Sequence, residues 1–146
     1  MKYMVQVFLL VFSFSASASQ LDNQEINKQA TLSDLSSLNW QNRLIVVNNI
    51  QNEKQALTIF EKHVDQIDDR HIVWFIIKDN KVLSNYSGKL SESLLTNIQN
   101  KYQIGQAKVV LIGKDGGVKS QFDFVDLESI FLQIDAMPMR QMEMRH

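Results

Sequence analysis

The sequence contains no cysteine, and this absence excludes whole classes of chemistry. Without thiols the chain cannot form disulfides, bind metal through thiolates, or carry out cysteine-based disulfide exchange or peroxide reduction. An excess of charge is also lacking, because 15 basic and 16 acidic residues give a net charge of −1. This balance predicts no nucleic-acid partner. A chain without disulfides must depend on its hydrophobic core for stability.

The chain also lacks an apolar run long enough to span a membrane, although its first residues are hydrophobic. Lys2 is followed by a mostly apolar segment, 3–14, and then by alternating serine and alanine up to Ala18. This order predicts a signal peptide over 1–18, cleaved after Ala18. The apolar segment is shorter than the roughly 20 residues of a membrane span, so no integral membrane segment is expected after cleavage. An uncleaved anchor is the alternative. We therefore expect an exported protein, in the periplasm of a Gram-negative bacterium or otherwise secreted.

The remaining residues divide into a polar lead-in, 19–30, expected to be flexible, and one domain, 31–146. Helical spacing of apolar residues predicts a helix at 52–67 with Asn52 as its N-cap, and Leu57, Phe60, Val64 and Ile67 on its inner face. A second helix is predicted at 91–102, with Ser91 as N-cap and Gly105 at the C-terminal cap. A third begins after Asp126 and ends at Pro138. Runs of strand-forming residues predict strands at 43–49, 72–77, 82–85, 109–112 and 118–124.

The order of these elements predicts an α/β protein with a thioredoxin-like fold. A β-α-β half is followed by a β-β-α half, which gives a central mixed sheet flanked by helices and, here, no redox cysteines. The crossover helix makes the first two strands parallel, and the tight turn at 113–117 makes the last two antiparallel. A flavodoxin-like sheet is the alternative, but the stretch 114–119 leaves no room for the helix that it requires.

Three segments resemble a known family. They run from Val109 to Lys119, from Ile134 to Gln141, and from Leu38 to Arg43. Together they resemble domain of unknown function 4174, a thioredoxin-like group of small exported bacterial proteins. Similar domains occur in animal coiled-coil-domain-containing and sushi-repeat-containing extracellular proteins. The resemblance covers about 32–145 and implies this fold and export. Because the family has no established function, it implies no catalytic residue and no cofactor.

Three polar motifs have an ordinary structural interpretation. The loop from Asn48 to Asn52 stands where a thioredoxin carries its two cysteines, and it offers a site for a small ligand at a helix N-terminus. Capping of that helix is the simpler interpretation. The segment from Lys114 to Gly117 lacks the spacing of a phosphate loop and is typical of a hairpin turn. The three histidines, His63, His71 and His146, lack the paired spacing of a zinc site.

The C-terminal tail is unusual because residues 137–146 include four methionines and one histidine. Soft thioether ligands favour Cu(I), so the candidate metal ligands are Met139, Met142, Met144 and His146. Methionine also fills gaps in apolar cores, which is the simpler interpretation. Since most residues after Pro138 are polar, we expect a loosely held tail, and we expect its removal from Met142 onward to leave the fold intact.

No nucleophile motif and no pair of carboxylates predicts a reaction. The leading hypothesis is therefore an exported, non-redox thioredoxin-like module that binds a periplasmic or extracellular protein. The alternatives are an enzyme with a cysteine-independent active site and a periplasmic Cu(I)-binding protein that uses the methionine-rich tail.

Overall fold

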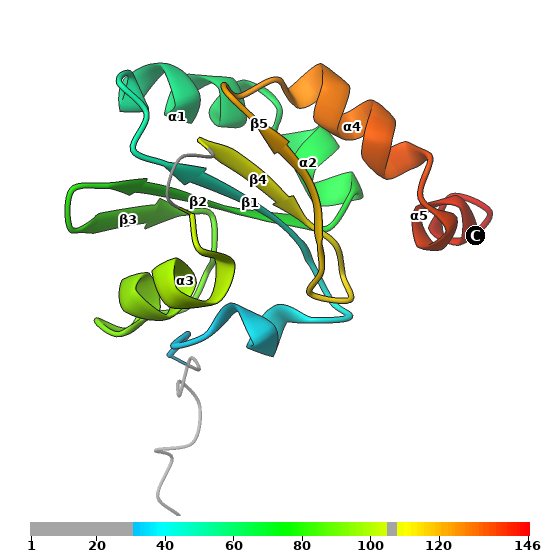
Figure 1. Cartoon of the computed structure of the whole chain (residues 1–146). Helices are drawn as coiled ribbons and strands as arrows, with labels where there is room; N and C mark the ends of the chain where they lie inside the picture. Colours follow the sequence, from blue (N-terminus) through cyan, green and yellow to red (C-terminus); the bar gives the residue numbers. More distant parts are fainter. Residues whose placement is uncertain (1–30, 105–107) are drawn as a thin grey trace, which may run out of the picture.

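A computed structural model describes residues 31–104 and 108–146, so the predicted signal peptide, the lead-in and Gly105 lie outside this part. Five strands form one mixed sheet in the order β3-β2-β1-β4-β5 (Figure 1). β1 pairs with β2 in parallel, whereas the β2–β3, β1–β4 and β4–β5 pairs are antiparallel. The strands are β1 (Arg43–Asn48), β2 (Ile72–Lys78), β3 (Lys81–Ser84), β4 (Val109–Ile112) and β5 (Val118–Phe122).

Helices cover both faces of this sheet. Figure 1 shows α1, α2 and α4 over one face, and α3 with the short 3₁₀ helix η1 over the other. None of these helices, nor α5, is long and apolar enough to cross a membrane; this holds for residues 31–104 and 108–146. The helices are η1 (Leu35–Leu38), α1 (Glu53–Lys62), α2 (Val64–Asp69), α3 (Leu94–Tyr102), α4 (Leu127–Asp135) and α5 (Pro138–Glu143).

The central strand β1 is buried on both faces of the sheet. Successive side chains of a strand point to opposite faces. Ile45 and Val47 accordingly join a cluster with residues of α1, α2 and α4, while Leu44 and Val46 join a second cluster with η1 and α3. A strand covered on both faces must be apolar throughout. The β-α-β half followed by the β-β-α half makes the fold thioredoxin-like, as the order of elements predicts.

The predicted helix at 52–67 is in fact two helices, because the chain turns at His63. This residue leaves the helical region with φ −119° and ψ 24°, and its Nδ1 lies 2.7 Å from the carbonyl oxygen of Ile59. The turn places Phe60 and Ile67 in the core but leaves Val64 exposed. The prediction that Val64 lies on the inner face is therefore wrong.

Two further boundaries differ from the prediction. α3 begins at Leu94, because residues from Ser91 form a turn in which the Ser91 hydroxyl accepts a hydrogen bond from the backbone of Ser93 at 3.0 Å. Pro138 does not simply end a helix: α4 stops at Asp135, and Pro138 is the first residue of α5. Proline lacks an N–H and has a fixed φ, so it suits the first turn of a helix.

Candidate functional site

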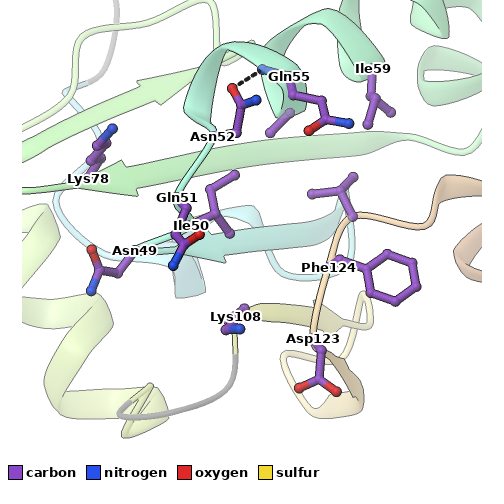
Figure 2. A pocket seen from close by; sticks show the side chains of 12 residues that line it. Asn49, Ile50, Gln51, Asn52, Gln55, Ile59, Lys78, Lys108, Asp123 and Phe124 are labelled. Atoms are coloured by element: carbon purple, nitrogen blue, oxygen red, sulfur yellow. Dashed lines mark hydrogen bonds between the residues drawn. The ribbon is translucent and has the colours of Figure 1, made fainter.

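A groove of about 540 Å³ opens at the C-terminal end of β1. Figure 2 shows its residues coming from the loop after β1, the start of α1 and the segment after β5. The chain leaves β1 toward β2 on one side and later returns to β4 on the other side. At this switch point the groove lies beyond the carboxyl ends of the parallel strands β1 and β2, where open α/β sheets bind ligands, and beside the start of the antiparallel strand β4. Four amide side chains line the groove: Asn49, Gln51, Asn52 and Gln55.

The predicted loop from Asn48 to Asn52 builds one wall of this groove. Asn52 is the N-cap of α1, as expected, and its Oδ1 accepts a hydrogen bond from the backbone of Gln55 at 3.1 Å. Asn48 donates from Nδ2 to the carbonyl of Ile104 at 2.8 Å, which ties the end of β1 to the segment after α3. The capping interpretation is confirmed, and the loop also borders a space that could hold a ligand.

The remaining lining of the groove combines charge with apolar surface. Lys78, Lys108 and Asp123 line the groove, and Nζ of Lys78 lies 3.9 Å from Oε2 of Glu53. Phe124 is 67% exposed, beside apolar side chains of α1. None of the described residues that line the groove is a serine, threonine, histidine or tyrosine. The amide, charged and apolar side chains that line the groove are suited to holding a ligand by hydrogen bonds and apolar contact.

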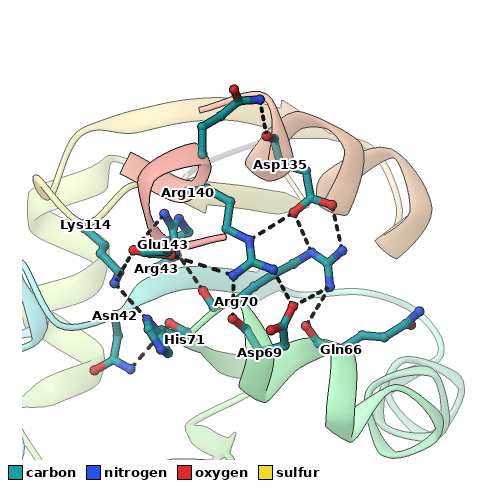
Figure 3. A network of polar contacts seen from close by, with 11 residues as sticks. Asn42, Arg43, Gln66, Asp69, Arg70, His71, Lys114, Asp135, Arg140 and Glu143 are labelled. Carbon is teal, nitrogen blue, oxygen red and sulfur yellow. Dashed lines mark hydrogen bonds and ion pairs between the residues drawn. The ribbon is translucent and has the colours of Figure 1, made fainter. Parts of the chain in front are cut away.

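The opposite end of β1 carries a network of charged side chains that no sequence pattern predicted (Figure 3). Its residues come from β1, the end of α2, the β4–β5 turn, α4 and α5, and their positions are far apart in the sequence. We call it the charge cluster. Its members are Arg43, Asp69, Arg70, Lys114, Asp135, Arg140 and Glu143.

Glu143 of α5 is the carboxylate that joins one half of the charge cluster. The Nη1 and Nη2 atoms of Arg43 donate to its two oxygens at 3.0 and 3.3 Å. Lys114 donates from Nζ to Oε1 of Glu143 at 2.7 Å, and Nζ lies 2.9 Å from Nδ1 of His71. Arg43 is only 1% exposed, and Lys114 is also buried. Two buried cations therefore depend on this one carboxylate.

The other half of the charge cluster ties α5 to α2 and α4. Arg70 donates to both oxygens of Asp135, at 3.0 and 2.7 Å, and its guanidinium lies 4.4 Å from the ring centre of Phe131. Arg140 donates to Asp135 at 3.2 Å, to the carbonyl of Asp69 at 2.7 Å, and to the Asp69 carboxylate. Bidentate arginine–carboxylate contacts of this kind fix orientation as well as distance.

The cations of the charge cluster lower the pKa of two of its carboxyl groups, Glu143 and Asp135. Burial acts to raise the pKa of Glu143, but the hydrogen bonds and positive charges of Lys114 and Arg43 together outweigh burial and hold that pKa below its ordinary value. For Asp135, burial is likewise outweighed by Arg70 and Arg140, and the pKa is lowered. Both groups are thus held in their charged form by the fold.

The expectation of a loosely held tail is wrong. α5 is a helix, Arg140 is buried, and Glu143 pairs with two buried cations. The candidate metal ligands Met139, Met142, Met144 and His146 are all exposed. Within residues 31–104 and 108–146, no group of three or more histidine or acidic side chains could hold a metal ion, but thioether sites are a separate question. The copper site therefore stays a prediction.

A second cavity, of about 480 Å³, lies beside the charge cluster. It is bordered by the β4–β5 turn on one side and by the connection between α4 and α5 on the other. The turn itself is the predicted hairpin turn: Gly116 has φ +80°, and a Cβ there would lie 2.9 Å from the side chain of Asn39. The neighbouring Trp40 donates its backbone N–H to the carbonyl of Lys114 at 2.6 Å.

Comparison with protein families places most of the described chain in one family. A family model described as Domain of unknown function (DUF4174) matches residues 34–143. The chain belongs to this family. The DUF4174 match begins next to η1 and ends at Glu143, so it includes every residue of the charge cluster. A comparison with curated proteins found no match.

Comparison with solved structures found the mitochondrial 2-Cys peroxiredoxin from Plasmodium falciparum. It is 14% identical, with a TM-score of 0.49, over 70% of this chain and 79% of that chain. This likeness carries no inference about activity. The assignment of the fold in this DUF4174 member rests on the strand order and pairing described above.

Proposed function

We propose that the protein is an exported, non-redox module that binds a segment of another protein in the groove at the C-terminal end of β1. The observation that carries the proposal is the position of this groove at the switch point of the sheet, together with its amide lining. The sequence contains no cysteine, so redox chemistry of the thioredoxin type has no reactive group here.

The side chains of the groove favour a peptide as the ligand. Amide groups both donate and accept hydrogen bonds, which matches the N–H and C=O groups of an extended backbone. Phe124, half-buried Ile59 and half-buried Ile50 offer apolar contacts for side chains of the same segment. Exposed aromatic side chains often supply much of the affinity at protein interfaces. Export is inferred from the signal-peptide pattern that ends at Ala18.

A comparison of two surface variants tests the proposal. The purified protein serves as bait for a periplasmic extract, beside the double variant Phe124→Ala, Gln51→Ala. Leu132→Ala is the matched control, because Leu132 is 68% exposed on α4 and does not line the groove. We expect the same partner to bind the wild type and the control, and to bind the groove variant at least tenfold more weakly. Equal capture by all three proteins, or capture of no protein by the wild type, would contradict the proposal.

A further inference from the structure

Trp40 stands out because it is both exposed and conformationally strained. Its backbone has φ 66°, in the left-handed region that bulky residues avoid, and its side chain is 67% exposed. The other tryptophan, Trp74, is buried and stacks on Phe60 with ring centres 4.9 Å apart. Trp40 is held in this position by its hydrogen bond to Lys114. The fold thus presents a large aromatic ring to solvent at the end of the molecule that carries the charge cluster.

The cavity beside the charge cluster suits an aromatic ring. Its volume, about 480 Å³, falls in the range of pockets that hold small organic ligands. Met137, Pro138 and Met139 form one apolar wall. Thioether sulfurs pack favourably against aromatic rings. Lys119 also lines the cavity; its ammonium pairs with Asp115 at 2.8 Å, and its aliphatic stem offers further apolar contact to a ring.

We propose that Trp40 of one copy of the chain inserts into this cavity on a second copy, and that the second copy returns the same contact. Trp40 and the cavity share one end of the molecule, since Trp40 is bonded to Lys114 and Lys114 lines the cavity. A protruding anchor and a matching cavity on one surface allow a reciprocal, two-fold contact that closes on itself. The proposal is independent of the peptide groove, which lies at the other end of β1.

The area available makes this a weak dimer. Two rings of this size that are two-thirds exposed supply on the order of 300 Å², and the cavity walls that they cover lose a similar area. The total, roughly 600 Å², is about half of the roughly 1,200 Å² at the lower end of stable interfaces. We therefore expect monomers at about 10 μM protein and a substantial dimer fraction near 1 mM.

Sedimentation velocity over this concentration range tests the proposal. The wild type is compared with Trp40→Ala, which removes the anchor, and with Ala136→Gln, which places a larger polar side chain at the cavity wall. Leu132→Ala again serves as the control for loss of an exposed apolar side chain. We expect each of the first two variants to lower the association constant at least tenfold, and the control to leave it unchanged.

Fluorescence gives a second measurement. In a Trp74→Phe background, emission comes from Trp40 alone, and it is expected to shift to shorter wavelength as the protein concentration rises. A wild type that stays monomeric at 1 mM with constant emission would overturn the proposal. So would a dimer that persists in Trp40→Ala. Loss of the dimer in Trp40→Ala but not in Ala136→Gln would show that the ring docks elsewhere, and the assignment of the cavity would fail.

Discussion

Replacing Glu143 by alanine is expected to destabilise the whole domain, although this residue lies near the end of the chain. Its carboxylate accepts hydrogen bonds from Arg43 at 3.0 and 3.3 Å and from Lys114 at 2.7 Å. In the variant both cations keep their buried positions and lose this counter-charge. A buried charge without a partner is strongly unfavourable. The same substitution in an exposed, unpacked tail would hardly change the free energy of unfolding.

The size of the expected destabilisation depends on how deeply these ion pairs are buried. Removing one member of a buried ion pair lowers the free energy of unfolding by about 3–5 kcal/mol. Glu143 itself is 22% exposed, so water can enter the vacated space, and we expect the lower end of that range, about 3 kcal/mol. For a domain of this length, that corresponds to a melting temperature lower by roughly 10 °C.

Urea denaturation of the wild type, Glu143→Ala and Glu61→Gln measures the effect. Glu61 is exposed on α1, so its variant should change the free energy of unfolding by less than about 0.5 kcal/mol. Sodium acetate offers a further check, because a small carboxylate can occupy the space that Glu143 leaves. We expect acetate to raise the melting temperature of Glu143→Ala more than chloride does at equal ionic strength, and to have no such specific effect on the wild type. A loss below about 0.5 kcal/mol in Glu143→Ala would refute the reasoning.

Three other predictions follow from the sequence and the structure. Phe131→Ala should lower the free energy of unfolding in urea by about 3–5 kcal/mol, because the ring is buried in the core. Because the fold lowers the pKa of Glu143 and Asp135, these groups stabilise the folded state at pH values above their unfolded-state pKa, about 4.3 and about 3.9, and this contribution is lost as the pH falls through the folded-state pKa. Melting curves should therefore show that the difference in stability between the wild type and Glu143→Gln becomes smaller as the pH is lowered. Intact-mass measurement of exported protein should show cleavage after Ala18, and a mature species that retains residues 1–14 would contradict this prediction.

The elements of the sheet could be predicted because their signals are local. Leu44 to Val47 and Ile72 to Ile77 are short apolar runs rich in β-branched and aromatic residues, a pattern typical of strands buried on both faces. Asn52 and Asp126 cap helices through contacts only three residues away, with Gln55 and Ser129. The break at His63 could not be predicted, because the apolar spacing continues across it.

The charge cluster shows what the sequence could not reveal. Arg43 pairs with Glu143 across 100 positions, and Arg70 pairs with Asp135 across 65. No periodicity or spacing marks such pairs, because their geometry exists only after the strands and helices are packed. The same holds for Trp40, which follows three core leucines in the sequence yet is exposed in the fold.

The sequence by itself determined the absence of thiol chemistry, the order of the strands, and the burial of the central strands, since each depends on composition or on neighbouring residues. The tertiary structure alone decided that the C-terminal tail is part of the folded domain. Charged side chains such as Arg140 and Glu143 are usually exposed. In this fold Arg140 is buried and Glu143 is half-buried, because each forms ion pairs with side chains from other elements. That arrangement depends on how α5 packs, and packing is a property of the folded chain as a whole.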